Sequence, residues 1–209
     1  MRVAVPKEIK AGEKRVALVP DVISKFTKLG YEVVIESGAG IYAQATDNDY
    51  EAAGAKIAVE VIKDADVVLS VQPLTSQQAS GLKKGAVTIS FLSPTTSIEN
   101  IEALAKAGAT AFSMELVPRI SRAQSMDALT SQALCAGYKA ALIGAELSPR
   151  FFPLLMTAAG TVTPAQVLVL GAGVAGLQAI ATARRLGAVV SAYDVRPSSA
   201  DEVKSMGAT

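Results

Sequence analysis

Short apolar runs alternate with amphipathic segments along most of the chain, and one kind of junction separates them repeatedly. The segments TKLGYEVVIE (27–36), AKAGATAFSME (105–115) and RRLGAVVSAYD (184–194) each pass from Lys or Arg, through Gly, into a β-rich run. Basic residues favour the negative end of the helix dipole, and Gly accepts the left-handed turn that closes a helix. The pattern therefore predicts a series of helix-to-strand transitions.

Strands are predicted near 2–5, 32–36, 67–71, 86–91 and 109–114, with helices between most of them. Apolar runs of this length, bounded by turn residues, are typical of strands that are buried on both faces. Alternation of strand and helix predicts an α/β fold, in which a mostly parallel sheet is covered by helices on both sides.

A long helix is predicted from about Asp127 to Glu146, with an apolar stripe formed by Leu134, Ala141, Leu142 and Ala145. We expect Cys135, within this helix, to be a small core residue. Pro and Gly interrupt the pattern after the helix. These breaks predict an N-terminal α/β domain over 1–146, a linker region over 147–164 and a second domain over 165–209.

Residues 151–183 carry no charge and are long enough for a membrane helix. Pro153, Pro164 and several glycines interrupt them, so we favour a loop, a buried strand and a helix start.

The second domain begins with a glycine pattern in a specific context. GAGVAG places Gly171, Gly173 and Gly176 in the G-x-G-x-x-G spacing, between the strand-like VLVL and the helix-like LQAIATARRL. The first Gly permits a tight turn, the second lets a pyrophosphate approach the backbone, and the third lets helix pack on strand. The phosphate is expected near the amide of Val174, at the start of the helix.

An acidic residue follows at the expected interval. Asp194 ends the next strand, where a carboxylate binds the adenosine ribose hydroxyls in dinucleotide-binding folds. A carboxylate repels a 2′-phosphate, so NAD(H) is favoured over NADP(H). Arg196 weakens this argument, because its side chain could cover the adenine or accept a phosphate. The alternative for Asp194 is a solvated strand end.

The fold class is therefore α/β with two Rossmann-like parallel-sheet domains. The second holds only strand, helix, strand and the helix-like SSADEVKSMGAT, and a further strand is expected after it. A complete dinucleotide-binding domain has two βαβαβ halves. We therefore expect residues 165–209 to be the start of an NAD(H)-binding Rossmann domain that is incomplete at its C-terminus.

Composition narrows the choice of chemistry. The net charge is +1, which gives no sign of nucleic-acid binding, and one cysteine excludes an internal disulfide. With no histidine in the sequence, we expect no zinc or transition-metal site. No apolar run follows the N-terminal Met-Arg, so a cytoplasmic location is the default.

One polar cluster stands out in a chain rich in Ala, Val and Leu. ELVPRISRAQSMDALTSQ (115–132) contains Arg119, Gln124 and Asp127, with no acid–base residue beside them. Asp127 alone would suit the first turn of a helix for capping and dipole reasons, and Arg119 alone would suit a surface loop.

Four segments together resemble the family of alanine dehydrogenase and proton-translocating nicotinamide nucleotide transhydrogenase. They are VPKEIKAGEKRVALVP, IESGAG, PRISRAQSMDALTSQ and GAGVAG with YDVRP. The resemblance spans essentially the whole chain. It departs at Gly12, where family members often have Asn, and at Val19, where Ser or Thr is usual.

The resemblance also separates two branches of the family. Alanine dehydrogenases use a His and a Lys as acid–base and cationic groups. Ser93 stands at the position of the His, and Ser70 and Gln72 occupy the positions around the Lys. Arg15, which those enzymes use for the substrate carboxylate, is retained, but one arginine does not perform proton transfer.

The resemblance favours the transhydrogenase branch, in which hydride passes directly between two nicotinamides. PRISRAQSMD is similar to the loop that contacts the nicotinamide half of NAD(H) in that branch. It implies catalytic and cofactor-binding roles for Arg119, Gln124 and Asp127, and a further hydroxyl from Thr130. Arg119 would pair with pyrophosphate or carboxamide oxygens, Gln124 with the carboxamide or ribose, and Asp127 with a ribose hydroxyl or Arg119.

The implied complex has several components. This chain would bind NAD(H), while NADP(H) would be bound by a partner component, the beta subunit, and a membrane segment would carry the proton. A homodimer, held peripherally at the inner face of the membrane by its partners, is implied. Two alternatives stay open, namely an NAD-dependent alanine dehydrogenase and a non-catalytic NAD-binding fragment.

Overall fold

The computed structural model describes residues 1–209, which divide into two compact units, residues 1–127 and 128–209. Each unit is built on parallel strands joined by helices, so the predicted α/β class is confirmed. The division falls at the start of a long helix. From the sequence, we expected the boundary after this helix, over 147–164. The division comes before the helix, because the helix packs with α6 (Val174–Arg185) of the second unit.

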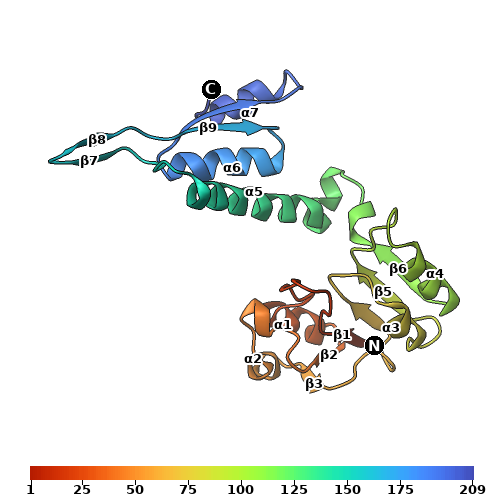
Figure 1. The fold of residues 1–209 in the computed structure, drawn as a ribbon. Coiled ribbons are helices and arrows are strands. Elements are labelled where there is room, and N and C mark those ends of the chain that lie inside the picture. The colour runs from red at the N-terminus through yellow and green to blue at the C-terminus, as the bar shows by residue number, and fades with distance from the viewer. The chain divides into compact units, whose positions relative to one another are not determined.

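The first unit contains a six-stranded parallel sheet in the order β3-β2-β1-β4-β5-β6 (Figure 1). All five predicted strands are present, and the prediction missed β3, a three-residue strand at one edge. The strands are β1 (Arg2–Val5), β2 (Glu32–Glu36), β3 (Lys56–Ala58), β4 (Val67–Leu69), β5 (Val87–Ser90) and β6 (Thr110–Ser113). The strand order reverses between β1 and β4, and ligands of doubly wound sheets bind at that point, beyond the carboxyl ends of the strands.

Side chains of β2 show how the sheet is covered on both faces. Val33 and Ile35 pack in one apolar cluster with Ile23 and Tyr50, whereas Val34 packs in another with Leu104. Neighbouring residues of a strand point to opposite faces, so one strand serves two cores. The helices that supply the covering side chains are α1 (Pro20–Lys28), α2 (Asp47–Ala52), α3 (Ser76–Ser80) and α4 (Ile98–Lys106).

The predicted helix-to-strand junction is confirmed in both units. Gly30, Gly108 and Gly187 follow α1, α4 and α6 with positive φ of 78°, 68° and 95°, and a strand begins within three residues of each. At the other ends of the helices, Thr46 and Asp49 form a capping box on α2, and α3 has an equivalent pair.

The second unit begins with the long helix α5 (Ala128–Leu147), close to the predicted range. The antiparallel hairpin of β7 (Leu155–Thr157) and β8 (Gly160–Val162) follows, and then β9 (Gln166–Leu170), α6 (Val174–Arg185), β10 (Val189–Tyr193) and α7 (Ser199–Ser205). β9 and β10 are parallel and in continuous register. The hairpin, which extends away from α6 in Figure 1, is absent from the sequence-based prediction.

The structure contains no strand after α7, where one was expected, but Thr209 pairs with the backbone of β10. Its N–H donates to the carbonyl of Val190 at 3.2 Å, and its carbonyl accepts from the N–H of Ala192 at 2.8 Å. These two bonds are the pattern of a parallel ladder on the outer edge of β10. The order of β9, β10 and this segment is that of the first half of a dinucleotide-binding sheet.

Helix α5 packs on α6 through a very close approach. A Cβ placed on Gly137 would lie 2.0 Å from the carbonyl oxygen of Ala175, in the first turn of α6. Ala141 of α5 and Ile180 of α6 belong to the same buried cluster, which also includes Phe152. Phe152 lies in the segment predicted to be a linker, so this segment contributes to the core of the second unit.

Two predictions for α5 are wrong. Cys135 is exposed, and Leu134 of the expected apolar stripe is 48% exposed, whereas Ala141 of the same stripe is buried. The buried face of α5 is centred on Gly137 and Ala141, because the contact with α6 requires small residues.

None of the helices in the chain combines the length and the apolarity needed to cross a membrane.

Candidate functional site

The turn between β9 and α6 uses its three glycines in three ways. Gly171 has φ of 97°, a left-handed conformation that permits the tight turn. A Cβ on Gly176 would lie 1.8 Å from the carbonyl oxygen of Gly171, so helix and turn touch through backbone alone. A Cβ on Gly173 would meet nothing within 4 Å, so the backbone there faces open space into which a ligand could come close.

The amino end of α6 is suited to an anion. Gly173 is the N-cap, α6 begins at Val174, and the helix is 12 residues long. The first N–H groups of a helix have no partners inside the helix, and the dipole favours negative charge there. Open space at Gly173 and the helix start at Val174 together have the form of a phosphate-binding turn.

Asp194 lies against this turn. The N–H of Gly171 donates to the carbonyl of Tyr193 at 2.7 Å, which carries the β9–β10 pairing to the ends of both strands. The N–H of Ala172 then donates to Oδ2 of Asp194 at 2.7 Å. The structure thus brings the glycine turn and the acidic residue together, as the motif predicted.

Arg196 holds the carboxylate of Asp194 from the other side. Its backbone N–H and its Nε donate to Oδ1 at 2.8 and 3.0 Å, and its Nη2 donates to Oδ2 at 3.1 Å. The side-chain bonds from Arg196, followed by the amide bonds from Arg196 and Ala172, hold the pKa of the Asp194 carboxyl well below its usual range. The carboxylate is therefore ionised at neutral pH and repels a second negative group placed beside it.

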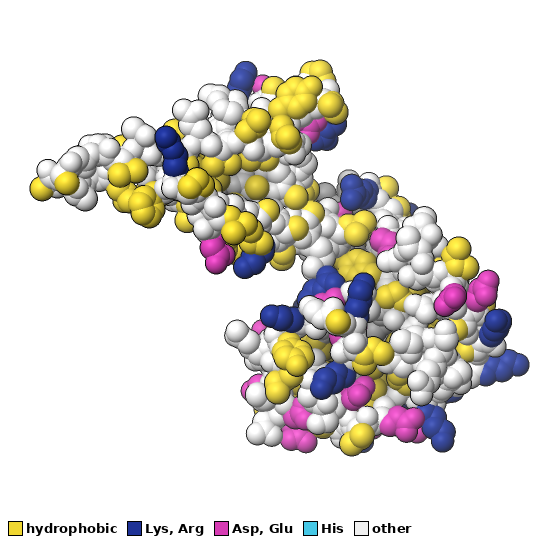
Figure 2. Space-filling view, in the orientation of Figure 1, with side chains coloured by type: hydrophobic (Ala, Val, Ile, Leu, Met, Phe, Trp, Pro, Cys, Tyr) yellow, Lys and Arg dark blue, Asp and Glu magenta, His cyan; other side chains and the backbone are white.

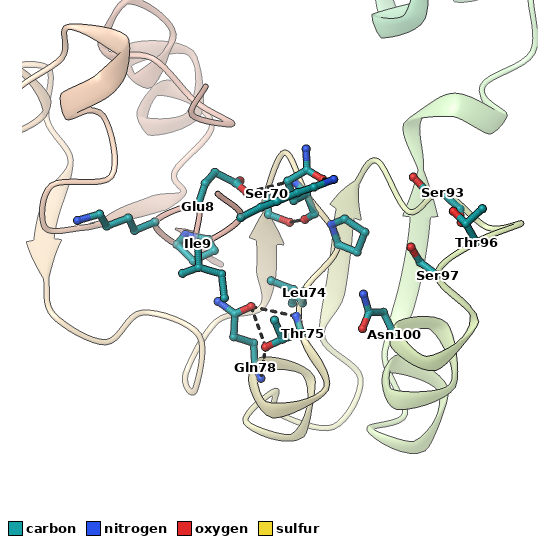
Figure 3. Close-up of a pocket in the computed structure, with 15 residues that line it drawn as sticks. Glu8, Ile9, Ser70, Leu74, Thr75, Gln78, Ser93, Thr96, Ser97 and Asn100 are labelled. Atoms are coloured by element: carbon teal, nitrogen blue, oxygen red, sulfur yellow. Dashed lines mark hydrogen bonds between the residues drawn. The ribbon is translucent and has the colours of Figure 1, made fainter. Parts of the chain in front are cut away.

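The first unit has a cavity of its own, of about 460 Å³, at the carboxyl ends of β1, β4 and β5 (Figure 3). This is the reversal point of the strand order. Hydroxyl and amide side chains dominate the lining, and the residues that carry them are Ser70, Gln72, Thr75, Gln78, Ser93, Thr96, Ser97 and Asn100. Lys7, Glu8 and Lys10 enter from the segment after β1.

A network around Gln72 ties the residues after β1 to the end of β4. Gln72 donates to Oε2 of Glu13 at 2.6 Å and accepts from Nζ of Lys10 at 3.2 Å. Arg15 pairs with the same Glu13, with Nε–Oε1 and Nη2–Oε2 distances of 2.7 and 2.6 Å. The guanidinium of Arg15 lowers the pKa of the Glu13 carboxyl to about 2. Arg15 is therefore already paired with a carboxylate of the protein itself.

Glu8 is the second carboxylate beside the cavity. It accepts from the backbone N–H groups of Val71 and Gln72 at 2.6 and 3.2 Å. Burial raises the pKa of the Glu8 carboxyl, although these two amide bonds oppose the shift. Glu8 thus fixes the loop after β4.

Ser93, which stands at the position of the dehydrogenase histidine, is held by Glu115. Ser93 has φ of 47°, and its N–H donates to Oε1 of Glu115 at 2.5 Å. Leu92 N–H and Ser113 Oγ donate to Oε2 at 3.1 and 2.5 Å. In the sequence, Glu115 stood out only as the first residue of the polar cluster. Its carboxylate serves instead to shape the loop after β5.

The predicted nicotinamide-site residues fall in a single segment that spans the end of the first unit. Gln124 lies in the 3-10 helix Ser121–Met126, and Arg119 lies two residues before its start. Asp127 follows that helix, and its N–H donates to the carbonyl of Gln124 at 3.2 Å. Arg119 and Gln124 are exposed, and Asp127 is half-buried. Thr130, in the first turn of α5, belongs to the second unit.

Besides Glu115, three groups that shape these sites were not predicted. Glu13 and Glu8 stood inside a quoted motif but had no assigned role, and Gly137 looked like any small helix residue. A Glu two residues before an Arg gives a weak signal of their pairing. The tight approach at Gly137 depends on a neighbour 38 residues away and has no local signature.

A parallel sheet, a glycine turn at a helix start and an acidic strand end define the class of α/β dinucleotide-binding folds. A family model described as "Alanine dehydrogenase/PNT, N-terminal domain" matches residues 4–136, and one described as "Alanine dehydrogenase/PNT, C-terminal domain" matches residues 140–209. The chain belongs to the alanine dehydrogenase/PNT family, which confirms the resemblance drawn from its motifs.

Individual relatives agree with this assignment. "NAD(P) transhydrogenase subunit alpha" of Cereibacter sphaeroides is 47% identical over 211 residues, which are 100% of this chain and 40% of the relative. The first portion of the same subunit in Rhodospirillum rubrum is 52% identical over 215 residues, which are 99% of this chain and 56% of that protein. Alanine dehydrogenase of Mycobacterium tuberculosis is 36% identical over 201 residues, which are 93% of this chain and 54% of that protein. The chain thus spans about half the length of these curated relatives.

Solved structures show the same likeness. A crystal structure of transhydrogenase from Sinorhizobium meliloti matches with a TM-score of 0.98 and 50% identity, over 100% of this chain and 63% of that one. An L-alanine dehydrogenase structure matches with a TM-score of 0.87 and 28% identity, over 99% of this chain and 58% of that one.

The contrast between Gly176 and Gly173 gives a prediction about stability. Gly176→Ala should lower the unfolding temperature by several degrees, because its methyl group would overlap the Gly171 carbonyl. Gly173→Ala, the matched control, should lower the unfolding temperature much less, since its methyl group enters open space and only the weaker N-cap preference of Ala is lost. Differential scanning calorimetry of both variants checks this. Equal losses would mean that close packing at Gly176 is not what holds the turn.

Proposed function

We propose that this chain is the NAD(H)-binding part of a proton-translocating transhydrogenase, in which hydride passes from NADH to NADP. The proposal rests on one feature of each unit, taken together. The second unit retains a complete phosphate-binding turn with its acidic partner, while the first unit has Ser93 and Gln72 where the dehydrogenase branch has acid–base and cationic groups.

The second unit has the features that NAD(H) requires. Pyrophosphate would lie against Gly173 and Val174, where no side chain intervenes and the helix dipole is favourable. Asp194 would accept the two hydroxyls of the adenosine ribose. Its negative charge favours NAD(H) over NADP(H), so the NADP(H) site would belong to a partner component.

The first unit would supply the residues for the nicotinamide half. Arg119 would pair with a pyrophosphate or carboxamide oxygen, Gln124 with the carboxamide, and Asp127 with a ribose hydroxyl or Arg119, while Thr130 of the second unit would add a hydroxyl. Bound NADH supplies the hydride, and no side chain needs to take up a proton in that step. The residues of this chain act by holding the ring at a fixed distance and angle, which can lower a barrier by several kcal/mol.

Several observations weigh against the dehydrogenase alternative. Arg15 is paired with Glu13, so it is not poised for a substrate carboxylate. Ser93 and Gln72 line the cavity at the positions where the resemblance implies the acid–base and cationic groups of the dehydrogenases, and Gln72 is bonded to Glu13. Alanine-dependent reduction of NAD by the full-length protein, measured at 340 nm, would overturn the choice between the two branches.

The partners follow from the proposed reaction. A membrane segment and an NADP-binding beta subunit would complete the enzyme, and the chain would lie at the inner face of the membrane through them. The subunit names of the relatives support such partners.

Self-association is a separate element of the proposal, and the hairpin supports it. Leu155, Met156 and Val162 of the hairpin are 37%, 74% and 44% exposed, and Figure 2 shows hydrophobic side chains along it. An exposed apolar surface of this kind favours a homodimer. Sedimentation equilibrium of the full-length protein should give twice the monomer mass. Met156→Glu should shift it towards the monomer, and a monomeric unsubstituted protein would contradict the proposal.

Asp194→Ala should weaken NADH binding about tenfold, because charge-assisted bonds to the ribose are lost. Titration of the full-length protein with NADH, followed by nicotinamide fluorescence, measures this. Asp201→Ala, which removes an exposed carboxylate from α7, is the control for net charge. Unchanged affinity in Asp194→Ala would mean that this carboxylate does not bind the nucleotide.

Arg119→Ala should slow hydride transfer more than it weakens NADH binding, because its expected contact positions the reacting half of the nucleotide. Arg122→Ala, three residues away and also exposed, is the control. Stopped-flow transfer with the reconstituted complex, together with NADH titration, separates the two effects. A larger loss in binding than in rate would leave Arg119 as an affinity contact only.

A further inference from the structure

The carboxylate of Asp194 has no acceptor position left. Oδ1 receives the backbone N–H and Nε of Arg196, and Oδ2 receives the N–H of Ala172 and Nη2 of Arg196. An ionised carboxylate offers about four lone-pair sites, and four donors fill them. A new donor, such as a ribose hydroxyl, must therefore replace one that is already present.

The four donors are not equally fixed. The amides of Ala172 and Arg196 belong to the backbone of the turn and of the strand end, and the bond between Gly171 N–H and Tyr193 carbonyl holds the turn to the strand. The guanidinium is at the end of a flexible side chain that is 57% exposed, whereas the Asp194 side chain is 10% exposed. The backbone amides cannot leave without moving the turn, whereas rotation of the exposed Arg196 side chain removes its guanidinium, so the guanidinium is the donor that can leave.

Departure of the guanidinium would free one position on each carboxylate oxygen. Nε leaves Oδ1 and Nη2 leaves Oδ2, while a backbone amide stays on each oxygen. Two vicinal hydroxyls, one for each oxygen, match this arrangement. The guanidinium therefore has the same donor pattern towards Asp194 as the diol of a ribose.

On this basis we infer that Arg196 is a specificity-determining place-holder, which occupies the ribose positions of Asp194 until a nucleotide displaces it. This inference rests on the proposed function, namely that the second unit binds a dinucleotide. Binding is then an exchange, in which the two side-chain bonds from Arg196 to Asp194 are replaced by two from the ribose, and the long bond from Nη2 to the Ala172 carbonyl, 3.4 Å, is also lost. Arg196 adds no affinity for NADH, because its bonds must first be broken.

The same pairing determines how the site treats a 2′-phosphate. The ionised carboxylate of Asp194 repels the phosphate and also holds the guanidinium of Arg196 in its own ion pair. Removal of the carboxylate would reverse both effects. The guanidinium would then be free, beside the 2′ position, to pair with phosphate oxygens in the bidentate geometry that arginine favours.

Titration of the full-length protein and four variants with NADH and with NADPH tests the inference. Arg196→Met keeps the apolar stem and should bind NADH at least as tightly as the unsubstituted protein. Asp194→Ser should lose NADH affinity and gain NADPH affinity about tenfold over the unsubstituted protein. The double variant Asp194→Ser with Arg196→Met should lose that gain.

Arg185→Met is the matched control, since it removes a positive charge from the exposed last turn of α6. It should leave the affinities for NADH and NADPH unchanged. The inference is overturned if Arg196→Met weakens NADH binding as much as Asp194→Ala, if Asp194→Ser gains no NADPH affinity, or if Arg196→Met strengthens NADH binding and Arg185→Met strengthens it equally. Failure of the unsubstituted protein to bind NADH would instead overturn the proposed function.

Discussion

The backbone contact between Gly176 and the carbonyl of Gly171 is the constraint on which the second unit depends. A Cβ at position 176 would lie 1.8 Å from that oxygen, so only glycine lets the helix start directly against the strand end. This contact fixes the direction of α6, and with it the direction of the helix dipole. It also brings the N–H of Ala172 to the carboxylate of Asp194. The proposed phosphate site and the proposed ribose site are therefore parts of one backbone arrangement.

In the first unit, carboxylates instead of glycines fix the loops at the ends of the strands. Glu8 binds the amides after β4, and Glu115 binds the amides after β5, so two loops at the reversal point of the sheet are fixed by charged acceptors. Charge-assisted bonds of this kind are stronger than bonds between neutral groups. The cavity between these loops is shaped by residues that do not need to take part in any reaction.

The features that could be predicted from the sequence are those with a local cause. Lys or Arg followed by Gly identified three helix ends, because charge and backbone conformation act within one turn. The glycine spacing with Asp194 predicted a tight turn and an acidic strand end, which the structure brings together. β3 was missed because three residues carry too little periodicity. Cys135 was placed in the core wrongly, because the buried face of α5 is set by α6 and not by the apolarity of α5 itself. The hydrogen bond between Gln72 and Glu13 could not be predicted either, because the two residues are 59 positions apart and meet only in the folded chain.

The close approach of α5 and α6 has a consequence for how a ligand would be captured. Gly137 lets the backbone of α5 rest on the carbonyl of Ala175, so the first turn of α6 is supported from behind. An arriving anion would meet amides that already point the right way, and little chain entropy would be lost on contact. Encounter would then be governed by diffusion and long-range attraction instead of by loop rearrangement. A residue outside every nucleotide motif would thus contribute to the speed of the proposed recognition.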